Sequence, residues 1–197
     1  MKEPLHLIFV CIANRNRSPF AEFFFSKLIS EKNNEFANEI RVTSAGFVPQ
    51  RMRETMAEIK IGVPEPFFDR PLARTTRVAL AGKNISVPEE WRTRELTSDM
   101  VKEADLIITA LPDQKKEIMR LYPKEVPTIF TLREISQWEG YLLLEDHEFR
   151  GIPRDSTLWD YVEENPGYVS EILVETERIL IKAYSHILDQ LALKAAP

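Results

Sequence analysis

The feature that most constrains the fold is a short apolar run that leads into a polar loop and a helix start. Residues 5–10 (Leu-His-Leu-Ile-Phe-Val) are almost wholly apolar, which is typical of a strand buried on both faces of a parallel sheet. A polar loop over residues 11–17 follows. Ser18 and Pro19 then open a segment with apolar residues at helical spacing, with Ser18 as the expected N-cap. The chain therefore begins as strand, loop and helix.

Further strand candidates alternate with helix candidates along the chain. Apolar stretches predict strands over residues 39–47, 104–111 and 126–132. Apolar residues at helical spacing, bounded by residues that favour helix starts and ends, predict helices over residues 71–81, 98–103, 112–121 and from 166 onward. This alternation indicates an α/β fold, a single doubly wound, flavodoxin-like, four-stranded parallel sheet with helices on both faces. We expect one domain over residues 1–197, with irregular inserts near 49–70 and 140–159.

Composition excludes several classes of protein. One cysteine in 197 residues cannot close an internal disulfide, which favours a reducing compartment over a disulfide-stapled secreted module. No apolar run reaches the roughly 18 residues of a membrane span, and residues 1–10 lack a signal-type pattern. We therefore expect a cytoplasmic protein that has no membrane partner.

Charge is unevenly placed along the chain, although the net charge is only −5. Residues 41–94 hold ten basic and six acidic side chains, whereas residues 134–177 hold twelve acidic and two basic ones. Two interpretations stay open: solvated faces of each sign, or a cationic rim that draws anionic substrates to a site. Nucleic acid is not expected as a partner, because there is no polybasic run.

The loop after the first strand has the composition of an anion site with a nucleophile. Ligands of open α/β sheets bind beyond the carboxyl ends of the strands, which is where residues 11–17 lie. Such a loop can turn successive backbone N–H groups inward, backed by a helix N-terminus. The same surroundings favour the thiolate of Cys11, to which Ser18 can donate a hydrogen bond, and Arg17 offers a planar fork for two phosphate oxygens. The pattern predicts attack by a thiolate on a bound phosphoryl group.

The motif Val-Cys-x-x-Asn-x-x-Arg-Ser-Pro, placed after an N-terminal strand, resembles the loop of the low-molecular-weight protein tyrosine phosphatase family. Residues 43–46 (Thr-Ser-Ala-Gly) resemble the family's Ser-Ala-Gly segment. Residues 92–96 and 104–108 resemble its Ser-Arg-x-Leu and Ala-Asp-Leu-Ile-Leu segments. The likeness runs in order over residues 5–132, and the loop is its most specific part.

The resemblance implies a role for each matching residue. Cys11 is implied to be the nucleophile, Arg17 the phosphate clamp and Ser18 the stabiliser of the thiolate leaving group. Asn14 and Ser44 are implied to hold the loop by side-chain hydrogen bonds. The phosphate would be bound by the whole loop: Ile12, Ala13, Asn14, Arg15, Asn16, Arg17 and Ser18.

Three loop residues depart from the family's pattern. Ala13 replaces a glycine, so either alanine adopts a backbone angle usually left to glycine or the loop differs locally. Asn16 replaces the second loop cysteine, so the family's protective disulfide cannot form. Arg15 occupies the position that helps choose the substrate, and it either welcomes a second anionic group or points to solvent.

The leaving group needs a proton, which the family takes from an Asp-Pro pair that this chain lacks. Asp160 is the first candidate for the general acid because it lies five residues before Asn165, the expected cap of the last helix. Asp155 and Asp146 are the second and third. The three histidines are dispersed, so we expect neither a metal nor another cofactor.

The sequence thus predicts a cysteine-dependent phosphomonoesterase, a hydrolase resembling protein tyrosine phosphatases, that acts on a phosphorylated protein or a small phosphoester. Two alternatives stay open. One is a regulatory module that binds phosphate without turnover; the other is a phosphatase for another phosphoester or for phosphoarginine. The sequence leaves the oligomeric state open.

Overall fold

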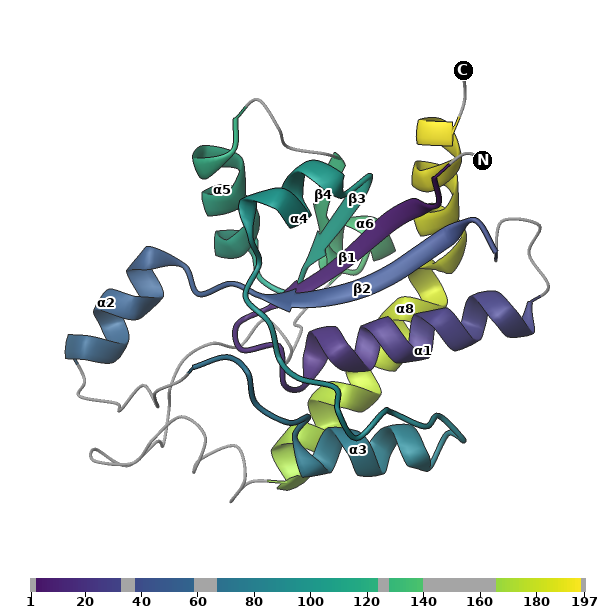
Figure 1. Ribbon diagram of the computed structural model, residues 1–197, viewed down its shortest axis with the longest axis horizontal. Helices are drawn as coiled ribbons and strands as arrows, with labels where there is room; N and C mark the ends of the chain where they lie inside the picture. Colours follow the sequence, from purple (N-terminus) through teal and green to yellow (C-terminus); the bar gives the residue numbers. More distant parts are fainter. Residues whose placement is uncertain (1–2, 33–37, 59–66, 124–127, 140–165, 196–197) are drawn as a thin grey trace.

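The computed structural model describes residues 3–32, 38–58, 67–123, 128–139 and 166–195 (Figure 1). Its strands, in chain order, are β1 (Leu5–Cys11), β2 (Ile40–Gly46), β3 (Leu106–Thr109) and β4 (Thr128–Thr131). Its helices are α1 (Arg17–Glu31), α2 (Gln50–Glu58), α3 (Arg74–Ala81), α4 (Ser98–Glu103), α5 (Pro112–Leu121), α6 (Leu132–Ser136) and α8 (Pro166–Ala195).

The four strands form one parallel sheet in the spatial order β2-β1-β3-β4, with helices on both faces. Figure 1 shows α1 on one side of this sheet and α5 on the other. The predicted doubly wound α/β fold is therefore confirmed. Because β1 lies between two neighbours and its last residue, Cys11, pairs with Gly46 of β2, the thiol is carried to the carboxyl edge of the sheet.

Alternate residues of β1 belong to two separate apolar clusters, because successive side chains of a strand point to opposite faces. Leu7 and Phe9 join the larger cluster, which includes residues of α1, α3 and α8. Ile8 and Val10 join the smaller one, which includes residues of α4 and α5. All seven residues of β1 are buried, which explains why its sequence is a continuous apolar run rather than an alternating one.

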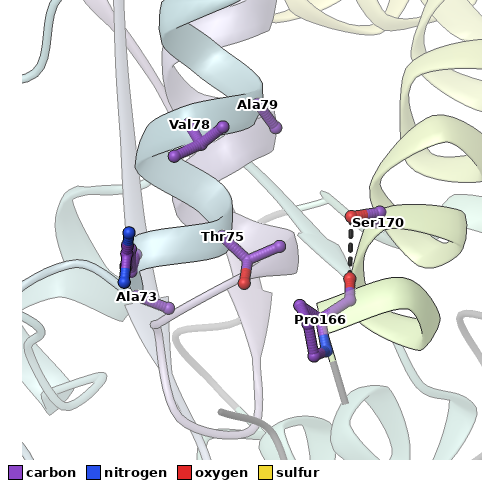
Figure 2. Close-up of a pocket in the computed structure, with 7 residues that line it drawn as sticks. Ala73, Thr75, Val78, Ala79, Pro166 and Ser170 are labelled. Carbon is purple, nitrogen blue, oxygen red and sulfur yellow. Dashed lines mark hydrogen bonds between the residues drawn. The ribbon is translucent and has the colours of Figure 1, made fainter. Parts of the chain in front are cut away.

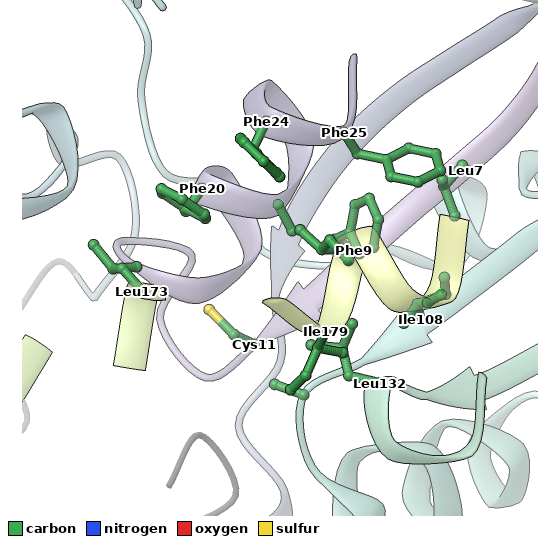
Figure 3. Packing of buried hydrophobic residues seen from close by; sticks show 14 of the residues in the cluster. Leu7, Phe9, Cys11, Phe20, Phe24, Phe25, Ile108, Leu132, Leu173 and Ile179 are labelled. Carbon is green, nitrogen blue, oxygen red and sulfur yellow. The ribbon is translucent and has the colours of Figure 1, made fainter. Parts of the chain in front are cut away.

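Aromatic packing joins α1 to the sheet. The rings of Phe9 and Phe25 meet edge to face with centroids 5.8 Å apart, and Phe25 also contacts Tyr184 of α8. Burial of each such side chain stabilises the fold by about 1.5–3 kcal/mol. Figure 3 shows Cys11 following Phe9 at the border of this cluster. The strand that carries the thiol is thus held by the larger apolar cluster.

Two helices begin at residues other than those predicted. Helix α1 begins at Arg17, so Ser18 lies in its first turn and is not the N-cap; Asn16 takes that position without a side-chain cap. The Ser18 hydroxyl is used for other contacts, described below. Helix α3 begins at Arg74 because Pro71, the predicted start, pairs with Arg92 in an isolated antiparallel bridge.

The segment 49–70, predicted as an irregular insert, contains helix α2. Met52 and Met56, one turn apart, are its buried residues, and the Glu117 carboxylate accepts a hydrogen bond from the Gln50 backbone N–H at 2.8 Å. A polar helix with only two buried side chains gives a weak periodic signal, which is why the sequence did not reveal it. The other predicted insert, 140–159, lies outside the described residues.

A buried histidine marks the opposite end of β1. His6 is 3% exposed; its Nδ1 accepts a hydrogen bond from Arg41 at 2.8 Å, and its Nε2 lies 2.7 Å from the Thr43 hydroxyl. An arginine can only donate, so Nδ1 carries no proton and the ring is neutral. Burial and, next, the Arg41 charge lower the pKa of His6 from 6.5 to about 4.

This low pKa makes stability depend on pH. The unfolded chain takes up a proton at His6 near pH 6.5 and the folded chain only near pH 4, so acidification through this window favours unfolding. In the variant His6→Gln, we expect the free energy of unfolding in urea to fall less between pH 7 and pH 4.5 than in the parent. The control His186→Gln, on α8, should keep the parent's pH dependence. An equal fall in the free energy of unfolding in the parent and in His6→Gln would contradict the assignment of this pH dependence to His6.

Candidate active site

The loop between β1 and α1 is compact and largely buried. Cys11 ends β1 and Arg17 begins α1, so residues 12–16 make the connection. The first intrahelical bond joins the Phe20 N–H to the Asn16 carbonyl at 3.0 Å, which directs the N-terminus of α1 at the loop. A helix N-terminus presents unpaired N–H groups and positive potential, both of which favour an anion.

The Cys11 thiol lies beneath this loop. The residue is 3% exposed, and the Ser18 hydroxyl donates a hydrogen bond to Sγ at 3.0 Å. The same hydroxyl lies 3.2 Å from the carbonyl oxygen of Ala45, a second acceptor for its single proton. The Ser18 hydroxyl therefore has two acceptors within reach, Cys11 Sγ and the Ala45 carbonyl oxygen.

Asn14 holds the loop from within. It is fully buried and has φ 53°, a left-handed conformation that asparagine tolerates better than most residues. Its Nδ2 donates to Ser18 at 3.0 Å and to Ser44 at 2.8 Å, and its Oδ1 accepts from the Arg94 backbone N–H at 3.0 Å. Ala13 has no left-handed angle, so the loop differs locally from the glycine-dependent pattern that the sequence suggested.

Glu22 and Arg94 extend this network, and the sequence alone had not identified either as a site residue. Glu22 accepts a hydrogen bond from the Ser44 hydroxyl at 2.5 Å and contacts the Arg94 guanidinium at 3.3 Å. Burial raises the pKa of Glu22, and the Ser44 hydrogen bond and the Arg94 charge oppose that rise. One signal was available: Glu22 lies one helical turn after Ser18, on the buried face of α1.

The other loop side chains have distinct environments. Arg15 is 6% exposed, so its side chain does not point to solvent, one of the two predicted possibilities. Asn16, which stands in place of the second loop cysteine, accepts a hydrogen bond from the Thr76 hydroxyl at 2.6 Å. This bond ties the loop to α3. Arg17 is half-buried at the first position of α1.

The three candidates for the general acid, Asp160, Asp155 and Asp146, lie outside the described residues, and their ranking stays a prediction. Within the described ranges, no three His, Cys, Asp or Glu side chains are grouped so as to hold a metal ion. In that same part of the chain, no helix is both long and apolar enough to span a bilayer.

A separate cavity of about 590 Å³ opens between α3 and the start of α8 (Figure 2). Its described lining is mainly apolar and includes Val78, Ala79 and Pro166, together with the exposed Arg74. None of its described lining residues belongs to the loop. The cavity is therefore distinct from the thiol site.

The fold and the loop define a class of α/β proteins in which a cysteine at the end of the first strand lies at the N-terminus of the first helix. Comparison with known proteins narrows this class. The family model described as low molecular weight phosphotyrosine protein phosphatase matches residues 6–63, which include Cys11, Arg17 and Ser44. No curated protein sequence matches the chain.

Solved structures share the fold over nearly their whole length. The YwlE arginine phosphatase from Geobacillus stearothermophilus is 19% identical with a TM-score of 0.61, and the match covers 96% of this chain and 97% of that one. YfkJ from Bacillus subtilis is 19% identical with a TM-score of 0.58, covering 93% and 96%. A low molecular weight protein tyrosine phosphatase from T. tengcongensis is 21% identical with a TM-score of 0.54, covering 87% and 96%.

The resemblance inferred from the sequence is confirmed by the family model, which matches residues 6–63 of the chain. The structural neighbours, all at low identity, support the fold alone.

Close packing at Gly46 makes the loop sensitive to one methyl group. A Cβ atom there would lie 2.3 Å from the Phe68 ring and 2.9 Å from the Ile12 carbonyl oxygen of the loop. We expect Gly46→Ala to lower the free energy of unfolding, measured in urea, by about 1–3 kcal/mol. Gly167→Ala is the control, since nothing lies within 4 Å of its added Cβ. A Gly46→Ala protein as stable as the control would refute this packing.

Proposed function

We propose that the chain is a cysteine-dependent phosphomonoesterase that works through a phosphocysteine intermediate on Cys11. The observation that carries the proposal is the hydrogen bond from the Ser18 hydroxyl to Cys11 Sγ, at 3.0 Å, beneath a loop held by Asn14. A thiol buried for packing alone has no need of a hydroxyl donor, whereas a nucleophile that must also act as a leaving group gains from one at both steps.

The reaction runs in two displacements. The Cys11 thiolate attacks phosphorus, the S–P bond forms, the bond to the leaving oxygen breaks, and that oxygen takes a proton from the general acid. Water then attacks phosphorus, gives its proton to the same carboxylate, and the S–P bond breaks to release inorganic phosphate and the thiolate. The Ser18 proton stabilises the sulfur each time it carries negative charge.

Charge on the transferring phosphoryl group needs donors that are already in place before the substrate arrives. In this proposal the backbone N–H groups of residues 12–18 surround the equatorial oxygens, and the Arg17 guanidinium holds two of them. The hydrogen bonds of Asn14 and Ser44 support this role because they keep the loop in shape through buried contacts. The loop then binds phosphate without first having to be ordered.

The substrate class is a phosphorylated protein or a small phosphoester, and two kinds of phosphorylated residue are candidates. The family description names phosphotyrosine, and one structural neighbour, YwlE from Geobacillus stearothermophilus, is an arginine phosphatase. Burial of Arg15 at the substrate-selecting loop position favours a departure from an ordinary phosphotyrosine pocket. Parallel assays with a phosphotyrosine peptide and a phosphoarginine peptide, otherwise of the same sequence, separate the two.

A phosphate-binding module without turnover is the alternative, suggested by Ala13, Arg15 and the missing Asp-Pro pair. The decisive measurement is rapid-quench kinetics with an aryl phosphate in the presence of excess chelator. We expect a burst of about one product molecule per chain, because phosphocysteine forms before it is hydrolysed. Cys11→Ser should abolish turnover and keep phosphate binding. Tight phosphate binding by the parent with no burst would establish the alternative.

The general acid can be identified by its dependence on the leaving group. We expect Asp160→Asn to lower kcat by about 10²–10⁴-fold with phenyl phosphate, whose phenolate needs a proton. The loss should be far smaller with nitrophenyl phosphate, whose leaving group is more acidic. Asp155→Asn and Asp146→Asn are the matched comparisons. If one of these shows the leaving-group dependence and Asp160→Asn does not, the assignment passes to that residue.

A further inference from the structure

The orientation of the Asn14 carboxamide is fixed by a group that can only donate. The Arg94 backbone N–H points at one end of this amide, so the atom that faces it must be the acceptor Oδ1. The Nδ2 group therefore faces the Ser18 and Ser44 hydroxyls and donates to both. The donor and acceptor roles in the hydrogen bonds of Asn14 follow from this one backbone contact.

Because both hydroxyls accept a proton from Asn14, each must donate its own proton away from Asn14. The Ser18 proton goes toward Cys11 Sγ and the Ala45 carbonyl oxygen. The Ser44 proton goes to the Glu22 carboxylate, at 2.5 Å. A donor for the thiolate at one end of the network thus requires an acceptor at the other end, and Glu22 supplies it.

Arg94 closes the network from the opposite side. Its Nε donates to the Ser44 carbonyl oxygen at 2.8 Å, and its Nη2 lies 3.3 and 3.4 Å from the two Glu22 carboxylate oxygens. The Arg94 carbonyl also accepts from the Gly46 N–H at 2.8 Å. These contacts hold the Arg94 backbone N–H where it meets Asn14.

We propose that Glu22 and Arg94 form an ion pair that positions the phosphate loop, acting through Asn14 and Ser18 on the Cys11 thiolate. The inference rests on the proposed function, since it assigns the pair a role in preparing that nucleophile. Neither residue touches the thiol, so both are positioning residues. The Glu22 side chain is 11% exposed and that of Arg94 is 42% exposed, so Arg94 connects the buried network to the surface.

The test follows the thiol directly, without turnover. The rate of Cys11 alkylation by iodoacetamide, measured against pH, gives a midpoint that reports how far the site favours the thiolate. We expect Glu22→Gln and Arg94→Gln each to move this midpoint upward by about half to one pH unit, because the Ser18 donor is less well held. We also expect kcat to fall by about tenfold or more with little change in KM, since misplacement affects the reacting geometry more than binding.

Each of the two residues has a matched control on its own segment, Arg92 for Arg94 and Glu31 for Glu22. Arg92→Gln removes an exposed guanidinium on the same segment that contacts only the Glu89 and Trp91 carbonyl oxygens among the interactions described. Glu31→Gln removes an exposed carboxylate on the same helix, where it pairs with Lys27. Both controls should keep the parent's midpoint. The double variant Glu22→Gln/Arg94→Gln should shift the midpoint no further than either single change, because the two residues act as a unit.

Near-UV circular dichroism establishes that each variant is folded. Should Glu22→Gln fail to fold, Arg94→Gln alone decides, since that side chain is partly exposed. If the folded variants have the same Cys11 alkylation midpoint as the parent, this inference is overturned and the proposed function stays intact. A shift in Arg94→Gln without one in a folded Glu22→Gln overturns the pairing. A parent midpoint no lower than that of a free thiol overturns the proposed function itself.

Discussion

The carboxamide of Asn14 is the contact on which the site depends. It is buried, it lies in a left-handed turn, and it joins the start of α1, the end of β2 and the segment that carries Arg94. A buried amide left unpaired would cost about 1–3 kcal/mol, so displacement of any of these partners would destabilise the fold. The loop is consequently shaped by long-range contacts as well as by its own residues.

Sequence reasoning succeeded where local signals and burial agree. The sequence predicts three elements to within about a residue of their bounds in the structure. These are β1 from its apolar run, α4 from its Thr97 cap and α5 from the proline at its start. It failed where a short element depends on a few contacts. Helix α6 begins at Leu132, at the end of the predicted strand over residues 126–132. Its start is marked by a reciprocal cap between Thr131 and Glu134, a four-residue pattern typical of a helix N-terminus.

The residues that contact the loop from distant parts of the chain could not be predicted from the sequence. Glu22 and Arg94 are 72 residues apart, and nothing local in either segment indicates that they meet. The hydrogen bond between Asn16 and Thr76 spans 60 residues and is equally hidden. That second bond also shows how the fold accommodates the loss of a loop thiol, because a polar side chain at this position gains a partner on α3. Local pattern thus predicts which residues form the site, and tertiary packing decides what supports them.

The burial of β1 between two neighbouring strands affects how the site responds to thermal fluctuation. The strand is buried along its whole length and pairs on both sides, so we expect its amide hydrogens to exchange with solvent through rare global opening rather than through fraying. Cys11 ends that strand. We therefore expect the backbone that anchors the thiol to stay in place for as long as the domain stays folded.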